Sequence, residues 1–112
     1  MPWSVETLDK KVVKELQALP ADMQAGYLRI AELIEEFGLR EVGMPHVGPL
    51  KGTRKPKLWE MRMKGRSGIA RAIYATAKRN RLIVLHVFAK KSGKTPQRAI
   101  NLAKARAKAL SQ

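Results

Sequence analysis

Three strand patterns in close succession, between residues 58 and 94, constrain the fold more than any other part of this chain. In the first, over residues 58–64, apolar and charged side chains alternate: Trp59, Met61 and Met63 face one way, and Glu60, Arg62 and Lys64 face the other. Such alternation is typical of a strand. The second pattern covers residues 69–77. The third, over residues 82–89, is the most apolar and β-branched segment of the chain. We therefore predict a three-stranded antiparallel meander in which residues 82–89 form the central strand, buried on both faces.

Two helices are predicted in the first half of the chain. Asp9 is a suitable N-cap for a helix over residues 10–18, which Pro20 ends. The second helix covers residues 21–37, and its apolar residues recur at helical spacing: Met23, Tyr27, Ile30, Ile34 and Phe37. Gly38 suits the position just after that helix. We expect the two helices to form an antiparallel hairpin.

The remaining segments predict one short strand, a long loop and a final helix. Residues 3–8 alternate briefly, which indicates a short N-terminal strand. Residues 39–57 are interrupted by glycines and prolines, so we predict a loop there. Thr95 and Pro96 have the residue types of an N-cap and a first helical residue, and the helix that follows would run from Gln97 to about residue 110.

Together these elements predict a single α+β domain over residues 1–112, with helices packed on one sheet. The chain has no run of 18 apolar residues, and its first residues do not form a basic region followed by an apolar one, so we expect neither a membrane span nor a signal peptide. It contains no cysteine, which excludes disulfides and thiolate chemistry and fits a cytoplasmic protein. With two histidines and no cysteine, a zinc site is not expected, and no phosphate-loop or dinucleotide motif indicates a cofactor.

Charge is divided unequally between the two halves of the chain. The formal net charge is +14, yet residues 1–50 carry 5 lysines and arginines against 8 acids, a net charge of −3. Residues 51–112 carry 18 lysines and arginines and a single acid, Glu60, a net charge of +17. A positive field this concentrated attracts polyanions. We therefore expect a nucleic acid or an acidic protein as a partner.

Cations at the predicted strands are the best candidates for a functional site, because no classical catalytic set is present. Arg71 shares a strand face with Ile69 and Ile73, which is an unusual place for an unpaired charge. Lys90 and Lys91 leave the third strand on opposite faces, so one of them, with Lys91 favoured, would line the site. Arginine forks on adjacent strands bind phosphate and stabilise the extra charge of a phosphorane-like transition state.

Several other basic side chains have two interpretations each. Arg62 is either a solvated sheet residue or a ligand of the substrate. His86 lies in the middle of the third strand, where a hydrogen-bonded core histidine is the more common role and a general acid or base the rarer one. His46 lies on the predicted loop and is interpreted as a surface residue. The basic residues that we expect to contribute to binding of the polyanion are Arg54, Lys57, Lys64, Lys90 and Lys94.

At these residues the chain resembles a known family. The similarity is carried by LWEMR at residues 58–62, RAIY at residues 71–74, VLHVFAKK at residues 84–91 and KTP at residues 94–96. Taken together, these motifs closely resemble the phage-derived, HigB-like branch of the RelE/ParE toxin superfamily, over roughly residues 50–110.

The resemblance implies a RelE-like α+β fold and the toxin of a type II toxin–antitoxin pair. Toxins of this kind enter the ribosomal A site and act as mRNA endoribonucleases (mRNA interferases) without a metal ion. In that reaction the 2′-hydroxyl of the substrate attacks the adjacent phosphate. Carried over by position, the resemblance implies that Arg71, Arg62 and Lys91 orient and neutralise this phosphate.

The resemblance also bears on the general base and on the partners. RelE has a tyrosine in its C-terminal segment, whereas no aromatic residue follows Phe88 here. Lys90, Lys94 or His86 would therefore replace it. The implied partners are mRNA, the ribosome and a cognate antitoxin, which in this branch is commonly a helix-turn-helix DNA-binding protein.

Two rival functions stay open at this point. The first is a ParE-like toxin that inhibits DNA gyrase by binding it and does not cleave RNA. The second is a catalytically inactive basic module that only binds nucleic acid or an antitoxin. Cleavage of mRNA separates the leading interpretation from both rivals.

Overall fold

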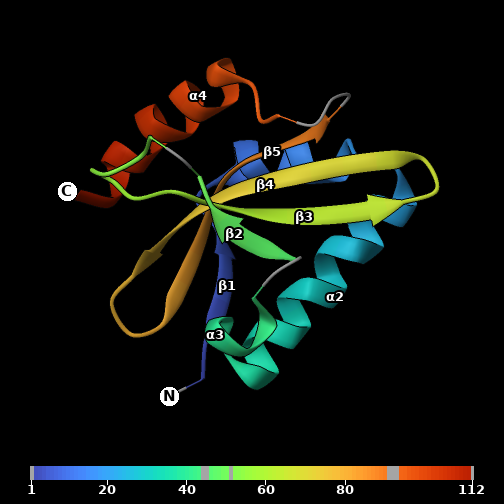
Figure 1. Ribbon diagram of the computed structural model, residues 1–112, viewed down its shortest axis with the longest axis horizontal. Helices are drawn as coiled ribbons and strands as arrows, with labels where there is room; N and C mark the ends of the chain where they lie inside the picture. Colours follow the sequence, from blue (N-terminus) through green and yellow to red (C-terminus); the bar gives the residue numbers. More distant parts are fainter. Residues whose placement is uncertain (1, 44–45, 51, 91–93, 112) are drawn as a thin grey trace.

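The computed structural model describes residues 2–43, 46–50, 52–90 and 94–111. Its elements, in chain order, are β1 (Ser4–Thr7), α1 (Lys10–Gln17), α2 (Ala21–Phe37), α3 (Leu39–Val42), β2 (Val47–Pro49), β3 (Trp59–Gly65), β4 (Gly68–Ala77), β5 (Arg81–Lys90), α4 (Gln97–Ala107) and the 3₁₀ turn η1 (Lys108–Ser111). The strands form one sheet, with α4 on one side of it and α2 and α3 on the other (Figure 1). The predicted α+β class is confirmed.

The five strands form one mixed sheet in the order β1-β5-β4-β3-β2. β3, β4 and β5 make the predicted antiparallel meander, β2 adds an antiparallel strand beside β3, and β1 pairs in parallel with β5. The prediction that residues 82–89 are the central strand was wrong. Because β1 and β2 extend the meander at its two ends, the centre is β4, in which residues 70–75 are all buried.

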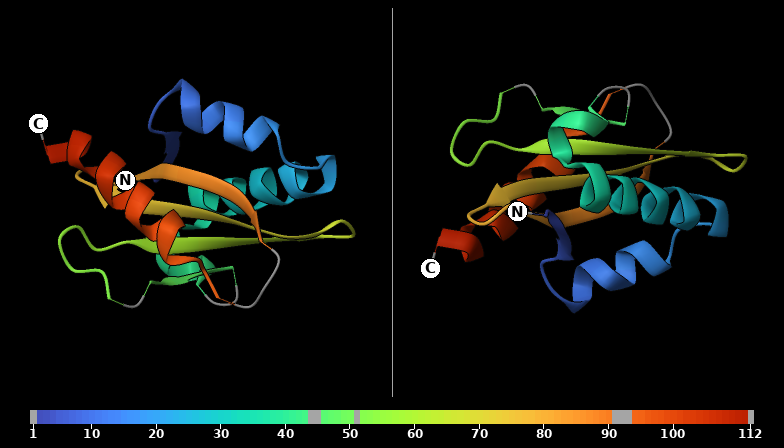
Figure 2. Two further views of the ribbon diagram at one scale, coloured as in Figure 1. Left: turned by 90° about the horizontal axis from the view of Figure 1, so that it is seen from above. Right: turned by 90° about the horizontal axis from the view of Figure 1, so that it is seen from below.

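The sheet separates two hydrophobic clusters. The first lies between the sheet and helices α1 and α2, and includes Val12, Tyr27, Ile34, Met61, Met63, Tyr74 and Val84. The second lies between the sheet and α4, and includes Ile73, Leu85, Ile100 and Ala103. Helices α1 and α2 run in opposite directions, as expected for a hairpin (Figure 2). Asp9 caps α1 as predicted, because its Oδ1 accepts a hydrogen bond from the backbone N–H of Val12 at 3.2 Å.

Residues 39–57, predicted to be a loop, contain the short helix α3 and the edge strand β2. The backbone explains why a strand forms there. The N–H of Arg62 donates to the carbonyl of His46 at 2.7 Å, and the N–H of Leu50 donates to the carbonyl of Leu58 at 3.0 Å. Glycine and proline, the signals for a loop, limit β2 to three residues without preventing its pairing with β3.

Two predicted roles near helix ends were wrong. Thr95 does not cap α4, whose N-cap is Pro96. Its hydroxyl donates to the carboxylate of Glu60 at 2.6 Å, since a charged acceptor on the neighbouring sheet competes with the helix end. Phe37, expected in the apolar stripe of α2, is 58% exposed, because α2 ends there and the chain turns away at Gly38, where φ is +91°.

The outer edges of the sheet limit the addition of further strands. On β1, the N–H of Val5 donates to the carboxylate of Glu35 at 3.0 Å. On β2, Pro49 has no N–H, and the N–H of Val47 donates to the carbonyl of Gly43. Edge donors that are already satisfied or absent reduce pairing with other chains. None of the helices formed by the described residues is long and apolar enough to cross a membrane.

Candidate functional site

The face of the sheet that carries α4 also carries the predicted cations. Alternation along β3 places Glu60 and Arg62 on this face, opposite to the apolar side chains of the same strand, as predicted. Cross-strand pairing then brings Arg62 directly beside Arg71 of β4. Side chains that are opposite one another on adjacent strands are close enough to interact. The sheet therefore assembles two arginines and one carboxylate from residues that the sequence separates.

Glu60 is the centre of this group. It is 6% exposed, and its Oε1 lies 3.2 Å from Nη2 of Arg62 and 3.6 Å from Nε of Arg71. Its other carboxylate oxygen accepts the Thr95 hydroxyl. One buried carboxylate thus contacts Arg62, Arg71 and Thr95, which come from β3, β4 and the segment before α4.

Arg71 is the least satisfied of these side chains. It is 8% exposed, and among the described residues its Nε and Nη1 have no hydrogen-bond partner. Burial lowers the pKa of its guanidinium, the charge of Glu60 raises it, and the charge of Arg62 lowers it again, with a net decrease. A buried donor without an acceptor is costly, so an acceptor from a ligand would be favourable at this position.

Lys90 completes what we call the cation cluster, namely Arg62, Arg71 and Lys90 around Glu60. Burial and the charge of Arg71 lower the pKa of the Lys90 ammonium, and the charge of Glu60 partly offsets this effect. The cluster has three cations and one anion, so it retains an excess of positive charge. Oriented cations with this excess can bind and neutralise a phosphodiester.

Other basic side chains extend the positive surface from the cation cluster toward α2. A hollow of about 140 Å³ is lined by Arg29, His46, Arg62 and Lys64, together with Gly26 and Ile30 of α2. His46, interpreted from the sequence as a surface residue, thus lies close to basic side chains. Lys94 is exposed and directly precedes Thr95, which contacts Glu60. Lys91, favoured in the sequence analysis, lies outside the described residues.

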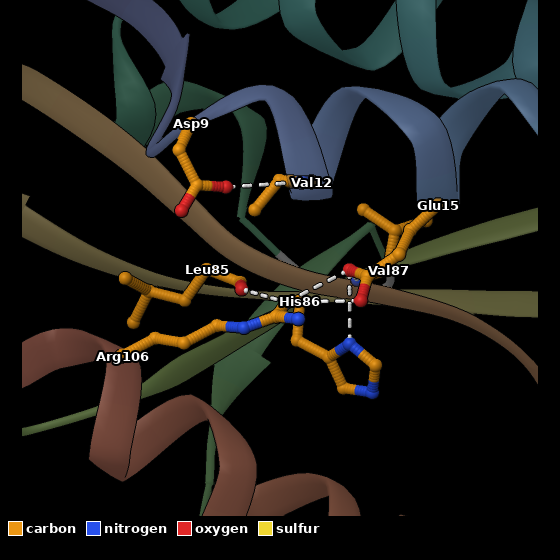
Figure 3. Close-up of polar contacts among 7 residues, drawn as sticks. All are labelled: Asp9, Val12, Glu15, Leu85, His86, Val87 and Arg106. Atoms are coloured by element: carbon orange, nitrogen blue, oxygen red, sulfur yellow. Dashed lines mark hydrogen bonds and ion pairs between the residues drawn. The ribbon is translucent and has the colours of Figure 1, made fainter.

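His86, for which a hydrogen-bonded core role was favoured and an acid or base role was the rarer alternative, belongs to a different group of polar contacts (Figure 3). Its Nδ1 lies 3.0 Å from Oε1 of Glu15, and its ring stacks on Phe88 with a centroid distance of 5.1 Å. The same carboxylate accepts the N–H of Val87 and pairs with Arg106, whose Nη1 also donates to the carbonyl of Leu85 at 2.8 Å. In the register of the sheet, Ile73 of β4 separates His86 from Glu60 of β3.

We call Glu15, His86 and Arg106 the edge clamp, because they connect α1 and α4 across the edge of β5. Burial raises the pKa of Glu15, but hydrogen bonds from Arg106, Val87 and His86 more than offset this, so the pKa lies below its ordinary value. The structure therefore places Arg62, Arg71 and Lys90 together and gives His86 a partner of its own.

A comparison of the sequence with protein-family profiles identifies the family of this chain. The profile of the family described as Phage derived protein Gp49-like (DUF891) matches residues 14–108, which is most of the chain. The chain belongs to the Gp49-like family. This is a family of toxin-like, phage-derived proteins. A comparison with curated proteins finds no significant match.

The match to the Gp49-like family runs from α1 to the end of α4, so it includes both the cation cluster and the edge clamp. Two further cations that we predicted to bind the polyanion lie elsewhere on this Gp49-like chain. Arg54 is exposed in the segment before β3, and the Nζ of Lys57 lies 5.5 Å from the centroid of the Trp59 ring, on the opposite face of the sheet from Arg71. Among the described residues, no group of three or more histidine, aspartate and glutamate side chains is arranged to hold a metal ion.

Sequence reasoning missed the role of Glu60. The signal was present, because Glu60 is the single acid among residues 51–112 and alternates with Arg62 on one strand face. The sequence does not show that Glu60 lies close to Arg71, because this contact depends on the register between β3 and β4. Glu15 and Arg106 were missed for a similar reason, since they are 91 residues apart in the sequence.

Proposed function

We propose that this Gp49-like protein is the toxin of a toxin–antitoxin pair and that it cleaves mRNA at the ribosome. The proposal is supported by the membership of a toxin-like family, by the net charge of +17 over residues 51–112 and by a fold that is consistent with the RelE-like α+β class. The observation that carries it is Arg71, a buried guanidinium with two nitrogen atoms that lack a hydrogen-bond partner among the described residues.

The chemistry that suits this cluster is transesterification within RNA. The substrate's O2′ attacks the adjacent phosphorus, the bond from phosphorus to O5′ breaks, and the products are a 2′,3′-cyclic phosphate and a 5′-hydroxyl. The proton of the 2′-hydroxyl passes to a base, and the departing O5′ accepts a proton from an acid. In our proposal the guanidinium groups of Arg71 and Arg62 neutralise the charge that develops on the phosphate oxygens.

Lys90 is our candidate for the acid that protonates O5′. An ammonium with a lowered pKa gives up its proton more readily than an ordinary lysine does, and the lowered pKa of Lys90 arises from its burial beside Arg71. Glu60 is the only described carboxylate that is paired with Arg62 and Arg71, so it is our candidate for the group that accepts the proton of the 2′-hydroxyl. His86 is the less suitable candidate, because its Nδ1 already contacts Glu15.

The decisive experiment is primer extension on cellular mRNA after brief induction of the wild type and of Arg71→Ala. Arg81→Ala is the matched control, because Arg81 is also an arginine of the sheet but is 47% exposed in its side chain and pairs only with Glu6 in the described contacts. We expect cuts inside translated frames with the wild type and with Arg81→Ala, and none with Arg71→Ala. Circular dichroism of the purified variants checks that they fold.

Growth arrest with intact mRNA would refute cleavage and would favour inhibition of gyrase, which a DNA supercoiling assay then tests. Absence of arrest would favour a basic module that only binds. Cuts that persist in Arg71→Ala would support RNA cleavage by this protein but would refute the cation cluster as the site of cleavage.

We also propose that an antitoxin neutralises the protein by placing an acidic segment on the basic surface around the cation cluster. Electrostatic complementarity of this kind governs the rate and specificity of association. The test is co-expression with the protein encoded beside it, followed by purification in increasing salt. Capture that is lost in Arg62→Ala or Lys64→Ala, and kept in Arg81→Ala, would support this surface.

A further inference from the structure

A second site lies on the opposite face of the sheet from the cation cluster. A cavity of about 560 Å³ is lined by side chains from β1, α3, β2, β3 and β4 or the residues next to them, among them Trp3, Leu39, Arg40, Val47, Trp59 and Tyr74. Small-molecule sites typically have volumes of roughly 300–1,000 Å³ and mostly apolar walls with a few polar groups. The size and lining of this cavity therefore suit a ligand of moderate size.

Two walls of the cavity are aromatic. Trp3 and Trp59 both line it, and both are partly exposed. They are also the two tryptophans of the whole chain. Indole rings at the surface of a cavity bind planar ring systems by stacking, and all four nucleobases can stack on such rings.

A buried polar group also lies beside the cavity. The side chain of Tyr74 is fully buried at the wall of the cavity, and among the described residues its hydroxyl forms no hydrogen bond. Burial raises the pKa of this phenol, so the group remains protonated and can only donate or accept as a neutral hydroxyl. A ligand acceptor that reached this hydroxyl would satisfy a group without a hydrogen-bond partner among the described residues.

Positive charge lies at the same place. Arg40 is exposed and lines the cavity, and the Nζ of Lys57 lies 5.5 Å from the centroid of the Trp59 ring. The chain as a whole carries a net charge of +14. An uncharged apolar ligand would make no use of these cations, whereas a ligand with a planar ring and an anionic group would use the whole site.

We propose that this cavity binds a nucleotide. The base stacks on Trp3 and Trp59 with an acceptor toward the Tyr74 hydroxyl, and the phosphate pairs with Arg40 and Lys57. A free nucleoside monophosphate and a nucleotide within single-stranded RNA share this chemistry. The site shares no residue with the cation cluster, so it stands or falls independently of the proposed cleavage of mRNA.

Tryptophan fluorescence reports on this cavity directly, because both tryptophans line it. We would titrate the full-length protein with AMP, adenosine, inorganic phosphate, indole and a four-residue oligoribonucleotide. We expect saturable quenching by AMP, weaker binding of adenosine and no response to phosphate alone. Tighter binding of the oligoribonucleotide than of AMP would identify RNA as the source of the nucleotide, and equal binding would identify the free nucleotide. Both results support the site.

Two variants test the assigned contacts. Arg40→Ala should raise the Kd for AMP about threefold to tenfold and leave the Kd for adenosine unchanged. Tyr74→Phe should weaken binding of AMP by a similar factor and at the same time keep or raise the Tm of the free protein, because it removes a buried hydroxyl that has no hydrogen-bond partner among the described residues. Arg98→Ala, an exposed arginine of α4 that does not line the cavity, is the control and should leave the quenching curve unchanged.

Three results would overturn the proposal. One is the absence of saturable quenching by AMP or the oligoribonucleotide. Another is binding of indole as tight as binding of AMP, which would make the cavity an apolar site. The third is an unchanged Kd for AMP in both Arg40→Ala and Tyr74→Phe.

Discussion

Glu15, which is partly buried, and Glu60, which is buried, both contact cations of neighbouring elements, yet their surroundings differ. In the edge clamp, the carboxylate of Glu15 accepts hydrogen bonds from Arg106 and from the N–H of Val87 and contacts His86, and Arg106 has a further acceptor in the carbonyl of Leu85. In the cation cluster, Glu60 accepts one hydrogen bond from Thr95 and pairs with two arginines at 3.2 and 3.6 Å.

This difference indicates that the edge clamp stabilises the fold and that the cation cluster is available to a ligand. A fully satisfied polar network holds structure together, since each charge has its partners inside the protein. A cluster with three cations and one anion keeps an excess of positive charge, and burial lowers the pKa of two of its cations, Arg71 and Lys90. Groups of this kind gather at functional sites, where a ligand supplies the missing charge.

The largest difference between the two regions should appear in Arg106→Met. This change leaves the Glu15 carboxylate without its main counter-charge and the carbonyl of Leu85 without its donor. We expect a loss of about 2–3 kcal/mol in the free energy of unfolding, measured by urea titration. Arg98→Met, on the exposed side of the same helix, is the control and should change it by less than about 0.5 kcal/mol. An Arg106→Met variant as stable as the wild type would show that the clamp contributes nothing.

Glu60→Gln should have a smaller effect on stability than Arg106→Met. It keeps the shape and the contact with Thr95 but removes the counter-charge of Arg62 and Arg71, so we expect a loss of about 1–2 kcal/mol. It should also raise the affinity for single-stranded RNA at low salt, because one negative charge is removed from a basic surface. Filter binding over a salt series measures this effect. Weaker RNA binding in Glu60→Gln would indicate that the carboxylate orients the arginines for the ligand.

Much of the fold was predictable from the sequence, because local patterns decide it. Alternation along residues 58–64 and the apolar run at residues 82–89 predicted the meander, and the helical spacing over residues 21–37 predicted α2 with its bounds. The position of β4 at the centre was not predictable, since it depends on where β1 and β2 pair. Both are strands of three or four residues with weak patterns of their own.

The sequence indicated the two arginines of the candidate site, Arg62 and Arg71, but not the role of Glu60. Arg71 and Arg62 were identified from residue type and strand face. Of the two lysines at the end of β5, the prediction favoured Lys91, which lies outside the described residues, and counted Lys90 among the residues that bind the polyanion. The partners of Glu60 depend on cross-strand register and on the side chain of Thr95, which the sequence assigned to a helix cap. Contacts of this kind join residues far apart in sequence, so periodicity alone does not reveal them.

Arg71→Met makes in the cation cluster the same substitution that Arg106→Met makes in the edge clamp, so the two variants can be compared directly. Methionine has a similar length and removes the two nitrogen atoms that have no hydrogen-bond partner among the described residues. We therefore expect the free energy of unfolding to stay within about 1 kcal/mol of the wild type or to rise, whereas RNA cleavage is lost by about a hundredfold or more. Urea titration and the cleavage assay measure the two effects. A loss of stability as large as that of Arg106→Met would show that Arg71 is a structural residue.

The dependence of stability on pH gives the smallest and most specific test of the edge clamp. The folded-state pKa of Glu15 lies below its ordinary value of 4.5, so its carboxylate stabilises the fold fully above that value. This contribution is lost as the pH falls from about 4.5 through the folded-state pKa.

Wild type and Glu15→Gln should therefore differ most in stability near pH 7 and converge in this acidic range. Urea titrations at several pH values measure the difference, and Glu32→Gln, an exposed acid of α2, is the control whose difference from the wild type should stay small throughout. A difference for Glu15→Gln that is constant from pH 7 to pH 3 would mean that the packing of the side chain, and not its charge, stabilises the edge of the sheet. The clamp would then no longer be the charged counterpart of the cation cluster.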